Sequence, residues 1–559
     1  MAARGSPVVE VPGKARSAGQ RLLDRVATPL SGLPRATTDY TIARAIKIPT
    51  RDGIELAADL YRPVEQPAGT LLVRGPYGRS AALALLQVRI FVARGYNALF
   101  VSSRGTFGSG GRFDPTMSEV DDGHDVVAWM RDQPWFTGNF ATVGGSYLGH
   151  TQWALMTDPP PELAAAVVSI GPHDFHEHVW GTGAFRLDFL SWSYGVVHQE
   201  DGGALKGATR LATSRRRINP FVNQLPLARA ADTCLDGRAS WYVDWVTRPD
   251  PGDPYWAPMQ HGAALEKVDV PILLIGGWQD IFLDQTIQQY ERLHARGVDV
   301  AMTIGPWSHL GVGAGGARLA SRETFDWLEE HLAHRGQRRR RAPVRVFVTG
   351  AKEWRELSEW PAASETQTLY LHADQGLHPL PPTAASAASS FTFEPADPTP
   401  TMGGPLLDFR CRVDDTALAQ RPDVLAFTGA VLDQPLDIVG TPVLELSHSS
   451  DNPHADLFAR ISEIDRRGRS HNVTEGYARL DPSRSESGGT LTLALRPTAH
   501  RFPAGSRVRL VIAGGCQPQF ARNLGTGENP GTGVGLRSAR HAVGHHREHC
   551  SRLLLPVSP

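Results

Sequence analysis

The stretch ATVGGSYLGHTQWA, residues 141–154, decides how the rest of this sequence is interpreted. An apolar run that favours β-structure enters two glycines, a serine and a tyrosine, and a pattern typical of a helix follows. Small residues are needed where a backbone turns this sharply. The stretch therefore predicts either an ordinary strand–turn–helix connection or a nucleophilic Ser146 on a tight elbow. The general G-x-S-x-G motif is met only in part, because Leu148 stands where its second glycine would be.

Apolar runs alternate with helical patterns on both sides of this stretch. A hairpin pattern covers 41–62, and a helix is predicted at each of 80–95, 121–133 and 286–297. Strands are predicted in the following ranges: 70–77, 96–105, 140–145, 162–171, 270–278 and 298–307. Apolar strands that do not alternate and are separated by helices are typical of a mostly parallel sheet covered on both faces. We therefore predict an α/β fold.

Two regions depart from this alternation. Residues 172–264 are rich in Trp, His, Asp and Gly with weak helical patterns, as expected of a helical cap inserted over the sheet edge. After 340, short β-like runs beginning with VRVFVTG recur between Pro, Gly and Asp turns, which favours a sandwich or jelly roll. The predicted organisation is a leader at 1–39, a core at 40–171 and 265–340, a cap at 172–264, and a jelly-roll domain at 341–559.

Composition narrows the functional classes. The 559-residue chain carries 57 Lys and Arg against 58 Asp and Glu, so its charge gives no case for binding nucleic acid or an acidic membrane. No apolar run is long enough to span a bilayer. The N-terminus lacks the apolar segment of a secretory signal and is predicted to be a flexible leader or a short surface helix. Four cysteines without a CxxC pair fit a reducing cytoplasm, although sequence does not exclude pairing.

A nucleophilic serine needs a base, and the base needs a carboxylate that orients it. An α/β-hydrolase supplies them in the chain order Ser, Asp or Glu, His, each in a loop after a later strand. Asp280 in LLIGGWQDIF and His309 in TIGPWSHLG stand directly after predicted strands and in that order. A lone Asp after a strand is usually a turn former, and a lone His is usually structural. Because Ser146, Asp280 and His309 all stand at the positions that the fold requires, we favour a catalytic triad.

At this point the chain resembles the cocaine esterase and X-prolyl dipeptidyl peptidase family of α/β-hydrolases, from about residue 40 to the C-terminus. The family's elbow reads G-x-S-Y-x-G, so Leu148 is no departure within it. The motifs that carry the resemblance are RGPYGR (74–79), SSRGTFGSGG (102–111), the helix-to-nucleophile segment 122–153, GGWQDIF (276–282), GPWSH (305–309) and RPDVLAFTG (421–429).

The resemblance implies that Ser146 is the nucleophile, Asp280 the orienting acid and His309 the base. It also implies an oxyanion hole made by the Tyr77 hydroxyl and the backbone N–H of Tyr147. The alternative for Tyr77 is a tyrosine at the core edge with its hydroxyl in solvent. Neither a metal nor an organic cofactor is required. The family often forms oligomers, so a homo-oligomer stays open.

Aromatic residues near these motifs are candidates for the substrate pocket. Phe282 follows the acid by two residues, and Trp180, Phe185 and Phe189 stand in the cap with Trp192 and Tyr194; a packed helical core explains the cap residues equally well. The cap acids could meet a substrate amine, but solvated loop acids are their default interpretation: Asp174, Glu177, Asp188, Glu200 and Asp201. Histidine clusters at 172–178 and 540–549 lack metal-site spacing.

The resulting hypothesis is a cytoplasmic serine hydrolase that cleaves a carboxylic ester or amide of a small molecule or short peptide through an acyl-enzyme. The alternatives are an X-Pro dipeptidyl peptidase, an amide acylase, and a non-catalytic protein that binds carbohydrate or protein through its jelly roll. The complete triad argues against the last of these. Ester and peptide substrates need the same triad, so the sequence leaves the choice between them open.

Overall fold

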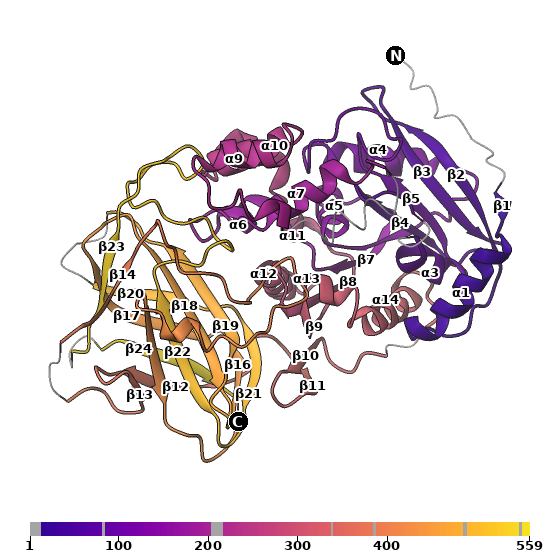
Figure 1. Cartoon of the computed structure of the whole chain (residues 1–559). Helices are drawn as coiled ribbons and strands as arrows, with labels where there is room; N and C mark the ends of the chain where they lie inside the picture. The colour runs from indigo at the N-terminus through magenta and orange to yellow at the C-terminus, as the bar shows by residue number, and fades with distance from the viewer. Residues whose placement is uncertain are drawn as a thin grey trace.

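The computed structural model describes residues 13–80, 84–202, 216–336, 339–383, 387–483, 489–546 and 550–558. Figure 1 shows a mixed α/β region at the N-terminal end of the chain and a β-rich region at the C-terminal end, with a group of helices adjoining both. This arrangement is the α/β-hydrolase core, helical cap and C-terminal β-region expected from sequence. No helix among these residues has the length and apolar character that crossing a membrane requires.

The core sheet has the strand order β1-β2-β3-β5-β4-β6-β7-β8-β9-β10-β11. Strands from β5 through β10 pair in parallel, whereas both ends of the sheet are antiparallel. β4 and β5 are buried along their whole length, which explains their unbroken apolar sequence. The strands are β1 (Lys14–Ala15), β2 (Tyr40–Pro49), β3 (Glu55–Pro63), β4 (Thr70–Gly75), β5 (Asn97–Ser102), β6 (Phe140–Gly145), β7 (Leu163–Ser169), β8 (Ile272–Gln279), β9 (Val300–Ser308), β10 (Val344–Val348) and β11 (Glu353–Leu357).

Helices cover both faces of this sheet. One apolar core includes side chains of α4 (Glu119–Arg131), α5 (Tyr147–Leu155) and α12 (Leu283–Ala295). The opposite core includes side chains of α3 (Ile90–Val92) and α14 (Ala317–His331). A π-helical turn, η1, at Leu85–Arg89 precedes α3, and the short α13 (His309–Val312) follows β9.

The N-terminal segment is partly helical. Residues 1–12 of the predicted leader lie outside the described residues, and the remainder contains α1 (Ala18–Ser31), as the surface-helix alternative predicts. Ser17 caps α1, and Gly32 ends it in a left-handed conformation with φ of +70°. Asp24 of α1 pairs with the buried Arg89, which holds this segment against the core.

The cap is built around aromatic side chains. Phe175, Trp180 and Trp245 belong to a cluster that also contains Phe282 of the core and Ala521 of the C-terminal region. This shared cluster attaches the cap to both neighbours. Its elements are α6 (Phe175–Trp180), α7 (Phe189–His198), α9 (Leu227–Cys234), α10 (Ser240–Thr247), the 3-10 helix η2 (Pro254–Met259) and α11 (Ala264–Lys267).

The C-terminal region is a mainly antiparallel β-structure with its own apolar core. Its main strand order is β14-β23-β17-β24-β12-β13-β15-β22-β18-β19, and β16, β20 and β21 attach beside this path. The strands are β12 (Glu365–Leu371), β13 (Gly376–His378), β14 (Ser389–Phe393), β15 (Val424–Gly429), β16 (Leu436–Gly440), β17 (Val443–Ser450), β18 (Asp456–Ile464), β19 (Ser470–Arg479), β20 (Gly489–Ala494), β21 (Thr498–Phe502), β22 (Arg507–Ala513), β23 (Ala539–Val543) and β24 (Arg552–Val557).

One strand differs from its predicted place. VRVFVTG was expected to begin the jelly-roll domain, but its β10 pairs in parallel with β9, with Val344 opposite Met302. β10 then turns back through β11, so the core sheet extends past residue 340. The reason is burial: alternate residues of β10 are buried against the sheet core, and strand periodicity alone does not reveal which sheet a strand joins.

Candidate active site

Ser146 occupies a sharp turn between β6 and α5. Its φ of +59° and ψ of −124° are uncommon for a residue with a side chain; such strain costs about 1–3 kcal/mol and persists only where the surrounding structure imposes it. The turn requires close backbone approach: a Cβ atom on Gly149 would lie 2.7 Å from the Cα of Gly171. The Ser146 N–H donates to the carbonyl of Ser169 in the neighbouring β7 at 2.9 Å. The glycines around the serine therefore let the chain form this elbow.

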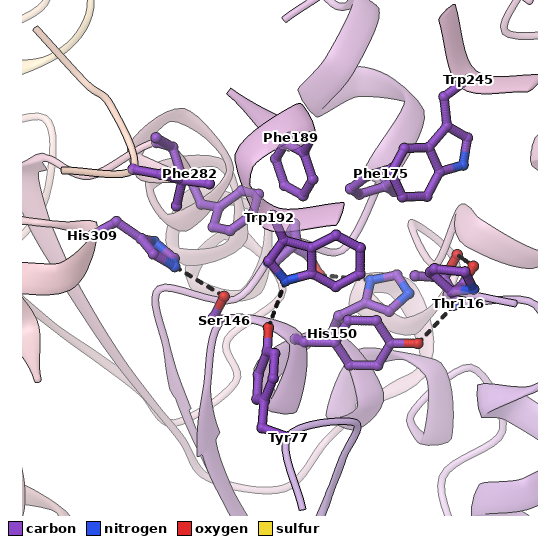
Figure 2. Close-up of a pocket in the computed structure, with 15 residues that line it drawn as sticks. Tyr77, Thr116, Ser146, His150, Phe175, Phe189, Trp192, Trp245, Phe282 and His309 are labelled. Carbon is purple, nitrogen blue, oxygen red and sulfur yellow. Dashed lines mark hydrogen bonds between the residues drawn. The ribbon is translucent and has the colours of Figure 1, made fainter. Parts of the chain in front are cut away.

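Strand register brings the acid and the base together. Gln279 at the end of β8 pairs with Ser308 at the end of β9, so Asp280 and His309 leave the sheet side by side. Asp280 Oδ1 accepts a hydrogen bond from His309 Nδ1 at 2.6 Å. His309 Nε2 lies 2.9 Å from Ser146 Oγ, as Figure 2 shows. The three predicted residues thus form one hydrogen-bonded chain.

The arrangement of these bonds determines the proton positions. A carboxylate only accepts hydrogen bonds, so the buried Asp280 selects the imidazole tautomer with a proton on Nδ1. His309 Nε2 is then the ring's basic nitrogen and faces the serine hydroxyl. This is the arrangement that a general base needs in order to take the Ser146 proton.

Hydrogen-bond donors lie next to the serine. Tyr77 follows β4, the strand beside β6, and the Trp192 indole N–H donates to its hydroxyl at 2.9 Å. Burial raises the pKa of Tyr77, so its phenol keeps its proton at neutral pH. Tyr147 is the first residue of α5, where a backbone N–H has no acceptor within the helix. These are the two groups that the sequence analysis predicts as oxyanion donors.

A compact, mainly aromatic pocket opens on Ser146 and His309 (Figure 2). Among the described residues that line it there is no Asp or Glu. One imidazole in its wall, that of His150, is neutral at neutral pH because burial lowers the pKa of His150 to about 4. The lining residues besides Ser146 and His309 are Tyr77, Pro115, Thr116, Tyr147, His150, Pro172, Phe175, Phe189, Trp192, Trp245, Ile281, Phe282 and Leu407.

Two of the four predicted pocket residues lie at this pocket. Phe282 and Phe189 line the pocket, whereas Trp180 and Phe185 do not and are buried in the interior of the cap. Trp180 donates its indole N–H to the carbonyl of Trp245 at 2.8 Å, and Phe185 packs on Trp180 with ring centroids 5.2 Å apart. The packed-core interpretation therefore holds for these two residues.

Other residues that line the pocket were not predicted from sequence. Phe175 and Trp245 come from α6 and α10, and Leu407 comes from the C-terminal region. The aromatic richness of 172–264 was a signal for the first two. No local pattern marks Leu407, because only the packing of the C-terminal region against the core brings it to the pocket.

The candidate acids of the cap have other partners. Asp174 caps α6 by accepting from the Glu177 N–H, and Asp188 pairs with Arg186 at 3.0 Å. Glu200 accepts from the Phe107 N–H at 3.0 Å, and Asp201 pairs with Arg238. Glu177 is exposed. None of these acids lines the compact pocket. Asp188 lines a wider cavity of about 1090 Å³ that also reaches Ser146 and His309, and its Oδ1 is buried without a hydrogen-bond partner among the described residues.

The histidine clusters serve packing in the part of the chain that is described. His176 bonds to the carbonyl of Pro249 at 3.0 Å, and His178 packs on Phe282 with ring centroids 4.4 Å apart. Burial lowers the pKa of His178 well below its usual value. Residues 547–549 of the second cluster lie outside the description. Within the described ranges, no group of three His, Cys, Asp or Glu residues could hold a metal ion.

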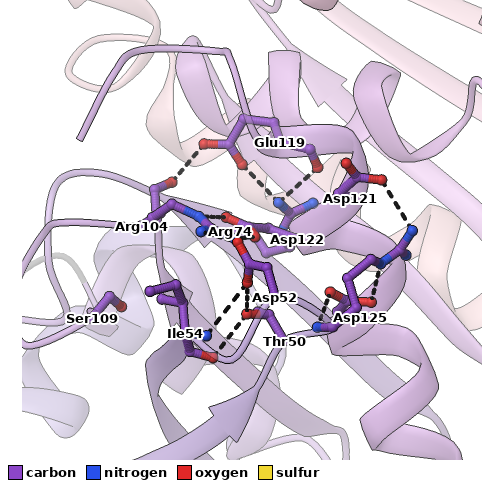
Figure 3. A network of polar contacts seen from close by, with 12 residues as sticks. Thr50, Asp52, Ile54, Arg74, Arg104, Ser109, Glu119, Asp121, Asp122 and Asp125 are labelled. Atoms are coloured by element: carbon purple, nitrogen blue, oxygen red, sulfur yellow. Dashed lines mark hydrogen bonds and ion pairs between the residues drawn. The ribbon is translucent and has the colours of Figure 1, made fainter. Parts of the chain in front are cut away.

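A buried ion pair between Arg74 and Glu119, drawn in Figure 3, contacts the residue that follows Ser146. Arg74 of β4 donates to Glu119 Oε2 at 2.7 Å, and Glu119 Oε1 accepts from the hydroxyls of Ser103 and Tyr147 at 2.8 and 3.0 Å. The Tyr147 hydroxyl in turn accepts from the Thr116 N–H. Glu119 therefore connects the strand before Tyr77 with the residue after Ser146.

Replacing Glu119 with glutamine is expected to destabilise the protein by about 3 kcal/mol, because it leaves the Arg74 charge buried without a counter-charge. Thermal denaturation measures the effect. The matched control is Glu162→Gln, which breaks a more exposed pair with Arg131 and is expected to cost less than about 1 kcal/mol. Equal melting temperatures for the two variants would contradict this account.

The C-terminal region reaches the acid loop. Arg496, between β20 and β21, donates to the carbonyl of Asp280 at 2.7 Å and pairs with Asp284 at 2.8 Å. Gln279 donates to the carbonyl of Val473 at 3.1 Å. These contacts and Leu407 make the β-region part of the site's framework.

Comparisons with known proteins match nearly the whole chain. The model of the X-Pro dipeptidyl-peptidase (S15) family matches residues 52–311, and that of the X-Pro dipeptidyl-peptidase C-terminal non-catalytic domain matches residues 337–554. A cocaine esterase from Rhodococcus sp. (strain MB1 Bresler) is 26% identical, covering 93% of this chain and 99% of its own.

Two solved structures share the fold. One is described as an α-amino acid ester hydrolase, with a TM-score of 0.79 and 21% identity over 95% of this chain and 99% of the other. The second is an aminopeptidase from a marine sediment Thaumarchaeota archaeon, with a TM-score of 0.77 and 21% identity over 94% of this chain and 98% of the other.

Proposed function

Since the chain belongs to the cocaine esterase and X-Pro dipeptidyl-peptidase (S15) family of serine hydrolases, we propose that it hydrolyses carboxylic esters whose acyl group is apolar and uncharged. The observation that carries this proposal is the Ser146–His309–Asp280 chain of hydrogen bonds beside the compact aromatic pocket, whose described lining residues include no Asp or Glu.

The mechanism proposed is acyl transfer in two steps. His309 takes the Ser146 proton as the serine oxygen attacks the ester carbonyl, and the imidazolium then protonates the departing alcohol. Asp280 stabilises that imidazolium. In the second step His309 activates water, which attacks the acyl-enzyme and releases the acid together with the free serine.

The oxyanion of each tetrahedral intermediate is assigned to the Tyr77 hydroxyl and the Tyr147 backbone N–H. These donors are supported by their places after β4 and at the start of α5. Donors that are already fixed where negative charge develops lower the barrier because they need no reorganisation during the reaction.

The pocket favours esters over X-Pro peptides, which present a charged α-amine. An ammonium in an apolar pocket loses hydration and needs a carboxylate partner. None of the acids considered for that role lines the compact pocket; Asp188 lines the wider cavity that also reaches Ser146, where it is paired with Arg186. An X-Pro dipeptidyl peptidase is therefore the second candidate, supported by the family match and by Asp188 in the wider cavity. An amide acylase stays an alternative that uses the same proposed triad.

A matched substrate pair tests this specificity. Phenyl 3-phenylpropanoate and the phenyl ester of phenylalanine differ only in the α-ammonium group. We expect kcat/KM to be at least about 100-fold higher for the first, because an unpaired ammonium costs several kcal/mol in an apolar pocket. An Ala-Pro anilide is expected to be slower still. Preference for either amine-bearing substrate would contradict the proposal.

The proposal includes a cytoplasmic enzyme that acts on small molecules. Cys234, Cys411 and Cys516 support this location, because they are buried as free thiols and a reducing compartment preserves them. A homo-oligomer stays open, and the proposed reaction needs no second subunit, because the residues assigned to it come from one chain.

A further inference from the structure

The indole of Trp192 lies beside the oxyanion donor and contacts it through its only polar atom. Trp192 belongs to cap helix α7, and its Nε1–H donates to the Tyr77 hydroxyl at 2.9 Å, as the dashed line in Figure 2 shows. This bond crosses from the cap to the loop after β4. It therefore links the cap to the core next to Ser146.

The direction of this bond determines whether the Tyr77 hydroxyl can still donate its own proton. An indole N–H is a donor only, whereas a phenol carries one proton and also accepts. Because Trp192 occupies an acceptor position of the Tyr77 oxygen, the phenolic proton remains available for an oxygen at Ser146. Accepting a hydrogen bond also polarises the phenol and strengthens its own donation.

Trp192 is held in place on its other sides. Its ring lies parallel to that of Tyr147, with an interplanar angle of 8°, and its centroid is 5.8 Å from that of Phe189. At the end of α7, Gln199 donates to the carbonyl of Pro76 at 2.9 Å, directly before Tyr77. Helix α7 thus contacts the Tyr77 loop at both the backbone and the hydroxyl.

We propose that Trp192 is a positioning residue for the reaction, which aligns the Tyr77 hydroxyl with the oxyanion so that cap helix α7 completes the oxyanion hole. This inference rests on the proposed function, because it requires Tyr77 to be an oxyanion donor. Its consequence is that the cap contributes to the chemical step in addition to forming the pocket wall.

The test uses Trp192→Phe, which keeps an aromatic ring and removes the N–H, together with Tyr77→Phe and the double variant. The matched control is Trp241→Phe. Trp241 of α10 donates its indole N–H to Ser193 Oγ, in the same helix as Trp192, at 3.2 Å. None of its hydrogen bonds or ring contacts among the described residues involves Tyr77. kcat and KM are measured with phenyl 3-phenylpropanoate in the full-length protein. Titration of active sites to completion with a fluorophosphonate corrects each rate for the fraction of folded enzyme.

We expect Trp192→Phe to lower kcat about tenfold, the size of one hydrogen bond. Tyr77→Phe is expected to lower kcat by about 100-fold or more. Adding Trp192→Phe to Tyr77→Phe should then change kcat by less than about twofold, because the bond's acceptor is already gone. Trp241→Phe should keep the wild-type kcat.

If Trp192 only packed in the pocket wall, Trp192→Phe would raise KM, and it would lower kcat/KM by the same factor in the wild type and in Tyr77→Phe. That result, or a wild-type kcat in Trp192→Phe, would overturn the inference while leaving the proposed function intact. A wild-type kcat in Tyr77→Phe would instead reject Tyr77 as an oxyanion donor, and the inference about Trp192 would be rejected with it.

Discussion

Ser146→Ala is expected to lower kcat for an aryl ester by about a million-fold, because the proposed mechanism forms the acyl-enzyme on the Ser146 oxygen. Ser146 stands on the sharp turn before α5, its Oγ contacts His309 Nε2, and it lines the compact pocket. Steady-state hydrolysis of phenyl 3-phenylpropanoate measures this loss.

The control for this variant is Ser118→Ala, which removes a hydroxyl that makes no capping bond at the start of α4. It is expected to keep wild-type activity. If Ser146→Ala hydrolysed the ester at even a hundredth of the wild-type rate, the reaction would not pass through this serine.

Asp280→Asn is expected to lower kcat by about ten-thousand-fold. An asparagine amide can donate to His309 Nδ1, which would place the imidazole proton on Nε2. The ring would then present a proton to Ser146 where it must accept one. The 2.6 Å bond between Asp280 and His309 makes this exchange of tautomer the direct consequence of the substitution.

Rates at neutral pH measure this effect, and the control is Asp269→Asn, an exposed aspartate paired with Arg296. The control is expected to stay within about twofold of wild type, as surface pairs contribute little. Activity of Asp280→Asn within tenfold of wild type would show that Asp280 does not orient the base.

The core of this fold could be predicted from sequence because its strands are buried on both faces. Their apolar runs at 70–77, 140–145 and 270–278 match β4, β6 and β8 closely. The candidate triad followed from the same regularity, since each residue stands directly after a strand of a parallel sheet. Periodicity did not assign β10 to its sheet, because the same alternating pattern suits either one.

The residues that line the pocket could not all be predicted, because tertiary packing brings them together and local sequence patterns do not show it. Trp180 and Phe189 are both aromatic residues of the cap, yet only Phe189 lines the pocket. The packing of α6, α7 and α10 against one another determines which aromatic rings lie at the pocket and which lie inside the cap. Leu407 lies about 100 residues beyond the base along the chain. The Arg74–Glu119 ion pair could not be predicted either, because no sequence pattern indicates that these two charged residues of separate segments form a buried contact.

The most direct test of the account is to locate the covalent adduct. The wild-type protein is treated with a fluorophosphonate, digested and analysed by mass spectrometry, with Ser146→Ala treated in parallel. The account predicts one phosphonylated peptide, carrying its label on Ser146, and no labelling of the variant at the same exposure. Equal labelling of the variant, or a label on another residue of the wild type, would contradict it.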